Sequence, residues 1–145
     1  KEPFLTGQAL ILLKNKLVST ATEAFNYEVL RAPETNLAQI QASARLLPMM
    51  GSHRLLVVQE AEEFEAAELA KFIPYLENPN PSTCLCFVSS KADLRTKFML
   101  KWKQVGLLLS LDPLTERQLP AFIKAEAQRF EVVLGNGVIE FLIDQ

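Results

Sequence analysis

A continuous apolar run at residues 54–59 restricts the fold more than any other part of this sequence. It reads RLLVVQ, with four branched aliphatic side chains in succession between two polar ones. A strand with one face in water alternates apolar and polar residues, so an unbroken run indicates a strand buried on both faces. We therefore expect this segment to be an inner strand of a parallel sheet.

The other segments alternate between helical and extended patterns. Apolar residues at helical spacing predict helices, and short apolar runs between turn residues predict strands. Pro3 is near the start of the first helix, Thr35 and Thr115 are expected helix caps, Pro74 disturbs the third helix and Pro120 lies early in a later one. We expect helices at residues 6–21, 35–47, 61–77, 93–104, 116–130 and 138–145, and strands at residues 26–32, 54–59, 83–89 and 107–111.

This order of elements predicts an α/β fold, with a parallel sheet flanked by helices on both sides. The last two expected helices have no strand between them. They fit the beginning of a small helical lid domain better than a continuation of the sheet. The sequence thus predicts one domain at residues 1–112 and the start of a second at residues 113–145.

Composition excludes several classes of protein. An apolar content of 49% is enough for a core, and a net charge of −2 argues against a surface coated with basic residues for duplex binding. No apolar run approaches the roughly 20 residues that cross a bilayer. No signal peptide is visible, although the abrupt first residues suggest that an upstream segment is missing.

The cysteines and the histidine do not form a metal-binding motif. Cys84 and Cys86 are two apart on an expected strand, so they point to one face and are poorly placed to bond to each other. His53 is far from them in sequence, and no zinc motif can be assembled. We expect both cysteines to be small core residues in a reducing cytoplasm.

The residues that would bind a nucleotide in such a fold are absent or altered. The sequence contains no GxxxxGK[ST] motif, whose backbone amides and lysine wrap phosphates. Glu2, near the expected position of that loop, has the wrong charge for a phosphate. Gln59 and Glu60 follow the central strand where such folds carry an acidic pair, and an amide weakens metal ligation. Glu60 is better explained as a helix-start residue than as a catalytic base.

An unusual apolar cluster precedes the central strand. Leu46, Leu47, Met49 and Met50 surround Pro48 and lie directly before Gly51, where a helix should already have ended. These side chains either fold back onto the core or are offered to a partner. We favour exposure, because a turn made by proline and glycine tends to lie at the surface.

A basic stretch leaves two interpretations open. Lys91, Arg95, Lys97, Lys101 and Lys103 lie on or near one expected helix that also contains Trp102. A solvated helix face with Trp102 tucked into the core is the simpler interpretation. Phosphate or DNA contact, through Lys97 and Lys101 above all, is the other.

Three segments together resemble one known family. They combine an LPMM-G helix end, an apolar strand, a YLENP turn, a DLRTKF helix start and a PLTERQLPAFI segment, and each would be weak alone. The chain is similar over nearly its whole length to the delta subunits of bacterial DNA polymerase III clamp loaders. The segments are AFNYEVLRAPETNLAQIQASARLLPMMGSHRLLVVQEAEEF, PYLENPNPSTCLCFVSSKADLRTKF and LDPLTERQLPAFIKAEA.

The resemblance implies an AAA+-like core without a functional phosphate loop, no cofactor and no enzymatic activity of its own. Delta subunits open the ring-shaped sliding clamp with a hydrophobic wedge at a helix end. The matching residues here are Met49 and Met50, with Leu46 and Leu47 beside them. Many relatives have an aromatic residue where this chain has Met50, but methionine also adapts to irregular pockets.

The resemblance also implies partners and a compartment. In the full-length protein these would be the sliding clamp (the beta subunit), the gamma/tau ATPase and delta-prime subunits, and primer-template DNA through the complex. The chain would then act in cytoplasmic DNA replication as part of the DNA polymerase III holoenzyme, a nucleotidyltransferase complex, with no membrane contact. It would be an N-terminal fragment without the first strand, most of the lid and the collar domain.

Two other classes of function stay open from the residues alone. One is a P-loop ATPase whose phosphate loop is missing from the sequence, although Gln59 argues against it. The other is a receiver-like signalling domain, which needs a phosphorylatable aspartate at a strand end. Gln59 and Glu60 do not supply that aspartate.

Overall fold

The computed structural model describes residues 3–135 and 137–143. The chain divides into two compact units, Lys1–Leu111 and Asp112–Gln145. Within the described ranges, no helix combines the length and the apolar character that a bilayer crossing requires.

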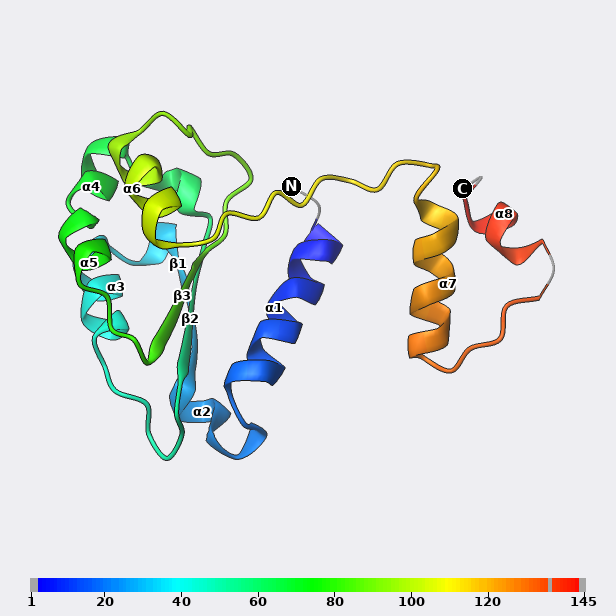
Figure 1. The fold of residues 1–145 in the computed structure, drawn as a ribbon, viewed down its shortest axis with the longest axis horizontal. Helices are drawn as coiled ribbons and strands as arrows, with labels where there is room; N and C mark the ends of the chain where they lie inside the picture. The colour runs from blue at the N-terminus through cyan, green and yellow to red at the C-terminus, as the bar shows by residue number, and fades with distance from the viewer. Residues whose placement is uncertain (1–2, 136, 144–145) are drawn as a thin grey trace. The chain divides into compact units, whose positions relative to one another are not determined.

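The first unit is built on a three-stranded parallel sheet (Figure 1). Its strands are β1 (Tyr27–Arg31), β2 (Arg54–Gln59) and β3 (Thr83–Phe87), in the order β1-β2-β3. All residues of β2 except the last are buried, which confirms the expected inner strand. In the register, Val57 lies opposite Val29 on one side and Cys86 on the other.

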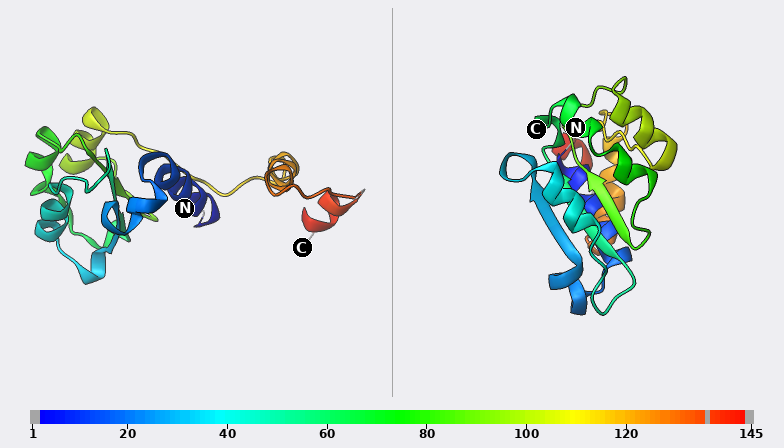
Figure 2. Two further views of the ribbon diagram at one scale, coloured as in Figure 1. Left: turned by 90° about the horizontal axis from the view of Figure 1, so that it is seen from below. Right: turned by 90° about the vertical axis from the view of Figure 1, so that its left-hand side faces the viewer.

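Helices cover both faces of this sheet, as the sequence predicts (Figures 1 and 2). One face carries α3 (Leu37–Ala44), α4 (Ala66–Ala70), α5 (Ile73–Glu77) and α6 (Lys97–Val105). The other face carries α1 (Pro3–Leu17). Short helical turns complete the unit: η1 (Thr20–Thr22), α2 (Glu23–Asn26), η2 (Ala32–Glu34) and η3 (Ala61–Glu63).

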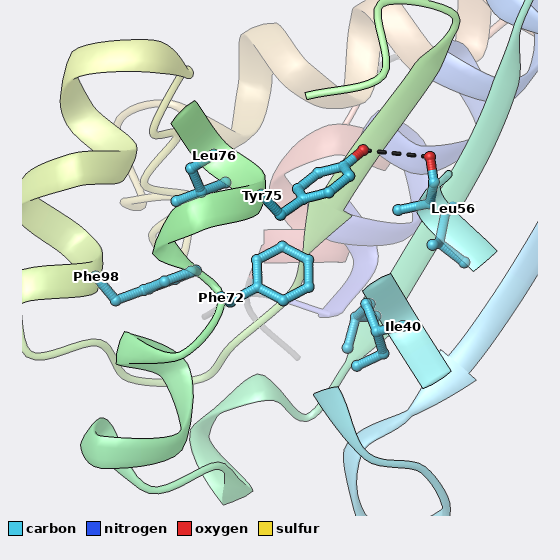
Figure 3. Packing of buried hydrophobic residues seen from close by; sticks show 8 residues of the cluster. Ile40, Leu56, Phe72, Tyr75, Leu76 and Phe98 are labelled. Carbon is cyan, nitrogen blue, oxygen red and sulfur yellow. Dashed lines mark hydrogen bonds between the residues drawn. The ribbon is translucent and has the colours of Figure 1, made fainter. Parts of the chain in front are cut away.

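An aromatic cluster fills the space between the sheet and α3, α5 and α6 (Figure 3). The Phe72 ring lies 5.0 Å from Tyr75, 5.8 Å from Phe87 and 6.5 Å from Phe98, between ring centroids. These tilted and edge-on pairs add to the apolar area that the cluster buries. The Tyr75 hydroxyl donates a hydrogen bond of 3.3 Å to the carbonyl of Ala44, so this buried polar atom has a partner.

A smaller apolar cluster lies on the α1 side of the sheet. Val18, Leu55, Val57 and Val88 are buried there, and Cys84 and Cys86 pack against them. The two cysteines therefore share a face as expected, but both are half-buried rather than fully buried. Burial, together with the neighbouring thiol, raises the pKa of Cys86 to about 11.

The prediction of a strand at residues 107–111 is wrong. These residues form no strand, and Leu107, Leu108 and Leu109 are exposed. The apolar pattern indicates an extended segment, but a strand also needs a neighbouring edge in register. No strand pairs with this segment in the part of the chain that the structure describes.

Several helix boundaries also differ from the expected ones. The single helix expected at 61–77 is divided into η3, α4 and α5. Pro74 accounts for the break between α4 and α5, because it lacks the amide that a continuous helix needs and lies in the first turn of α5 instead. The cap of α3 is Asn36, not Thr35: its side chain accepts from the Gln39 amide at 2.9 Å in a capping box.

The second unit contains α7 (Leu119–Arg129) and α8 (Val138–Ile143). The residue before α7 is Gln118, and the expected cap Thr115 instead donates its hydroxyl proton to the Gln118 side chain at 2.8 Å. The helix expected at residues 138–145 extends beyond the described residues. Glu2 also lies outside them. That these helices begin a lid domain stays a prediction.

Candidate functional site

The candidate site is the connection between α3 and β2, which we call the apolar turn and define as residues 46–51. α3 ends at Ala44, three residues earlier than expected, so the leucines lie on the connection and not on the helix. The turn lies at the amino end of the sheet, where β2 and β3 begin, and projects past that end in Figure 1.

Four large apolar side chains of the apolar turn are exposed. The exposed fractions are 54% for Leu46, 74% for Leu47, 54% for Met49 and 89% for Met50. An apolar cluster of this kind on a surface is typical of a site that binds another protein. The geometry thus agrees with exposure rather than with packing in the core, while the binding of a clamp by these residues stays a prediction.

Met50 has an unusual backbone conformation. Its φ is 52°, in the left-handed region that residues other than glycine rarely adopt. Such a conformation costs on the order of 1 kcal/mol and persists only where the surroundings enforce it. The turn is therefore held in this conformation by contacts to the residues around Met50.

The first of these contacts comes from Asn26, the last residue of α2. Its Nδ2 donates to the Met49 carbonyl and its Oδ1 accepts from the Met49 amide, both at 2.8 Å. The side chain is almost fully buried, with 1% exposed. One amide group thus fixes both polar backbone groups of Met49.

Gly51 allows this close approach. A Cβ added at residue 51 would lie 2.9 Å from the Asn26 Nδ2 and 3.6 Å from the Thr22 hydroxyl. A contact below 3.0 Å would force the Asn26 side chain to move. The glycine therefore gives the buried amide the room to reach Met49.

Asn80 holds the other end of the turn. Its Nδ2 donates to the carbonyls of Ala44 and Leu46 at 3.3 and 3.1 Å, and to the Thr83 hydroxyl at 3.2 Å. The Tyr75 hydroxyl reaches the same Ala44 carbonyl. Carbonyls at the end of a helix lack partners within the helix, so these groups cap α3 where the turn begins.

The buried side chain of Arg54 forms a polar cluster with partly exposed groups beside the turn. Its guanidinium donates to the Phe25 carbonyl at 2.6 Å and pairs with Glu28 at 2.8 Å. Ser43 also donates to the Glu28 carboxylate. This cluster ties β2, α2, β1 and α3 together at the amino end of the sheet.

The carboxyl end of the sheet carries the residues considered for nucleotide chemistry. Glu60 has a φ of 58° and accepts from the Arg31 Nε at 2.9 Å. The hydrogen bond and charge of Glu60 raise the pKa of the Arg31 guanidinium. Arg31 also contacts Glu34 at 3.0 Å, so Glu60 belongs to a surface ion-pair network.

Glu62 and Ser90 form a second polar contact at this end, through both the amide and the hydroxyl of Ser90. Burial alone would raise the pKa of Glu62, but the hydrogen bonds from the Ser90 hydroxyl and from backbone amides outweigh it and lower the pKa. The Glu62 carboxylate is therefore held in its charged form by neighbouring groups.

The side chains of the basic segment have different surroundings. Lys101 lies 3.6 Å from Glu77, and Lys97 is exposed on α6. Trp102 packs edge-on against Phe87, with ring centroids 5.5 Å apart, and its Nε1 donates to the Leu107 carbonyl. Trp102 thus packs against the core as expected, while phosphate contact by Lys97 and Lys101 stays a prediction.

The Nδ1 atom of His53 lies 2.9 Å from the hydroxyl of its neighbour Ser52. Among residues 3–135 and 137–143, no group of three or more potential ligands could hold a metal ion.

The side chains that the sequence singled out as candidate site residues lie at opposite ends of the sheet. Leu46, Leu47, Met49 and Met50 gather in one turn at the amino end of the sheet, whereas Gln59 and Glu60 lie at its carboxyl end.

Sequence reasoning missed Asn26 and Asn80. Each amide reaches backbone groups more than 20 residues away in sequence. Asn26 stands at the edge of an expected strand and Asn80 in an expected turn, where asparagine is ordinary. No pattern in one sequence distinguishes them from other asparagines.

The architecture defines the class of protein: an α/β domain in which helices flank a parallel sheet, a fold that it shares with a solved clamp-loader protein. The solved structure of the Bacillus subtilis DNA clamp loader delta protein (YqeN) is similar, with a TM-score of 0.75 and 22% sequence identity. That match covers 97% of this chain and 44% of that chain. At this identity the likeness shows the fold.

The sequence comparisons then identify the family. A family model described as "DNA polymerase III, delta subunit" matches residues 1–111. The curated "DNA polymerase III subunit delta" of Bacillus subtilis (strain 168) is 23% identical over 153 residues, covering 99% of this chain. The chain belongs to the DNA polymerase III delta subunit family. It spans 44% of the length of this curated relative.

Proposed function

We propose that this chain is the part of a clamp-loader delta subunit that binds the sliding clamp and helps to open it for loading onto primed DNA. Membership in the delta family supports a role in the clamp loader and in DNA replication. The observation that carries the proposal is the exposed apolar turn, in which Met50 is the most exposed of the four apolar side chains. Its role is mechanical, with no catalytic step of its own.

The energetics suit a small hydrophobic contact. Apolar area removed from water contributes roughly 25 cal/mol per Å², so two buried methionines contribute a few kcal/mol. A turn that is already ordered loses little conformational entropy on binding. The apolar turn is therefore a suitable anchor. The free energy needed to open a closed ring would come from the rest of the contact surface as well.

The further partners follow from the same family. In the full-length protein we propose contact with the gamma/tau and delta-prime subunits, and with primer-template DNA through the complex. Lys97 and Lys101 are the side chains through which this unit would approach a phosphate. This role places the protein in the cytoplasm.

The direct test is clamp binding by surface plasmon resonance. The cognate sliding clamp is immobilised, and the wild-type chain is compared with the double variant Met49→Ala/Met50→Ala. We expect affinity to fall at least tenfold, because anchors at the centre of an interface dominate its free energy. The thermal stability should stay unchanged, since both side chains are exposed.

A matched control is Ile11→Ala/Leu12→Ala on α1. These apolar side chains are also exposed, at 44% and 61%, but lie outside the apolar turn. Clamp affinity should stay within twofold of wild type. Equal losses in the two double variants, or a folded wild-type chain that does not bind at high micromolar clamp, would refute the proposed role of the turn.

A further inference from the structure

We infer that Asn26 is a positioning residue for the clamp contact: its buried amide presets the apolar turn so that Met50 is held exposed. This inference rests on the proposed function. Asn26 is almost completely buried, so it can act only through the residues around it. The group that it holds is the backbone of Met49, next to the most exposed methionine.

The chemistry of the asparagine side chain suits this task. A backbone amide can only donate and a backbone carbonyl can only accept, so the two bonds to Met49 fix the orientation of the Asn26 amide. Two bonds of 2.8 Å also fix the direction of the Met49 peptide groups. Alanine would offer neither group, and serine could not span both.

The strain at Met50 shows that the turn depends on such contacts. A left-handed φ of 52° at a methionine is unfavourable in a free chain. Asn26 acts on the residue before Met50, and Gly51 after it leaves room for the Asn26 amide. Without the amide, the backbone would relax into other conformations in which Met50 is displaced.

This predicts a kinetic signature. When only a fraction of the molecules has the binding-competent turn, the apparent affinity falls by that fraction. With rapid exchange between conformations, the association rate falls while the dissociation rate of the formed complex stays similar. Losing a side chain that touches the clamp acts mainly on the dissociation rate instead.

The experiment measures both rate constants for the full chain on the immobilised sliding clamp. We expect Asn26→Ala to lower the association rate about tenfold and to change the dissociation rate less than threefold. Met50→Ala should show the opposite pattern, with faster dissociation. The matched control is Asn36→Ala, which removes the cap at the other end of α3 and should change neither rate more than twofold.

The outcomes separate the inference from the proposed function. If the wild-type chain does not bind, both fall. If it binds and Met50→Ala weakens it, but Asn26→Ala matches Asn36→Ala, only the positioning role falls. Faster dissociation with an unchanged association rate in Asn26→Ala would also overturn it, since that pattern indicates a contact within the complex.

A second variant keeps the test decisive if Asn26→Ala fails to fold. Gly51→Ala leaves Asn26 in place but puts a methyl group 2.9 Å from its Nδ2. We expect slower association here as well, by about threefold or more. An unchanged association rate in a folded Gly51→Ala variant would contradict the inference.

The variant Asn26→Asp tests the donated hydrogen bond, because protonation of the introduced carboxylate can restore it. The carboxylate cannot donate to the Met49 carbonyl, but its protonated form can, and burial raises the pKa of such a group. The association rate relative to wild type at the same pH should therefore recover as the pH falls from 8 to 5. A ratio that does not change with pH would overturn the role of the donated hydrogen bond.

Discussion

The apolar turn at the amino end of the sheet and the loops at its carboxyl end are held by different chemistry. At the amino end, the apolar turn is fixed by the neutral amides of Asn26 and Asn80, which bond to backbone groups. At the carboxyl end, the loops after the strands are fixed by charged groups, such as the Arg31–Glu60 pair and the Glu62–Ser90 contact. Each end also contains a residue with a left-handed backbone, Met50 and Glu60 respectively.

This difference predicts how the two regions respond to salt and pH. Interactions between exposed charges weaken with salt and change with protonation, whereas bonds between amides and backbone groups do neither. The shape of the apolar turn should therefore be independent of pH and salt over the range in which the protein is folded. The loops at the carboxyl end should respond to both.

The largest expected effect is that of Asn80→Ala at the amino end. The variant loses the bonds to the Ala44 and Leu46 carbonyls and to the Thr83 hydroxyl. Each bond is worth about 0.5–1.5 kcal/mol net, and partial exposure lets water replace some of them. We expect the free energy of unfolding to fall by about 2 kcal/mol, measured by urea denaturation.

The control for this variant is Asn78→Ala. Asn78 is an exposed asparagine two residues earlier, and a change there should stay within about 0.5 kcal/mol. The loss in Asn80→Ala should be the same at pH 5 and pH 8, because the amide does not titrate. A loss that differs between these pH values would contradict the contrast between the two ends.

A smaller effect with the opposite sign is expected at Met50. Glycine adopts a left-handed φ without steric penalty, so Met50→Gly should be more stable than Met50→Ala by about 1 kcal/mol. Both variants should bind the clamp more weakly, because both lack the side chain. Thermal denaturation and clamp binding on the same samples would check this separation of stability from function.

Glu60→Gly is the matching change at the carboxyl end. It removes the same kind of strain but also gives up the contact with Arg31, so its gain should be smaller than that of Met50→Gly. If Met50→Gly is no more stable than Met50→Ala, the backbone at residue 50 is not strained. The role of the surrounding contacts would then be weaker than we infer.

The sequence predicts those parts of the fold that depend on local patterns. The run at residues 55–58 indicates a buried strand whatever its neighbours are, and β2 confirms it. Pro48 and Gly51 predict a surface turn, and the side chains between and beside them are exposed. Both predictions rest on residues adjacent in sequence.

Features that depend on distant partners could not be predicted. Residues 107–111 have the composition of a strand, but pairing is decided by which sheet edge lies nearby. Thr35 and Asn36 are both good caps, and the choice between them depends on the residue at which the helical backbone begins. The amide of Asn26 bonds to a residue 23 positions away, which only the folded chain reveals.

The smallest expected effect is the pH dependence contributed by Glu62 at the carboxyl end. Its pKa is lower in the folded protein than the ordinary value of 4.5, so the folded state binds fewer protons than the unfolded chain. The stability that Glu62 contributes is therefore present above pH 4.5 and is lost as the pH falls through its folded pKa. Glu62→Gln keeps an acceptor for Ser90 but does not titrate.

We expect Glu62→Gln to be less stable than wild type at pH 6 by less than about 1 kcal/mol, because the contact is only partly buried. The difference should shrink as the pH falls through the folded pKa of Glu62, since the wild-type carboxylate is then protonated in both states. The difference between wild type and Asn80→Ala should stay constant over the same range. Urea denaturation of the three proteins at several pH values measures both differences. Parallel pH profiles for Glu62→Gln and Asn80→Ala would show that the two ends are held by the same kind of interaction after all.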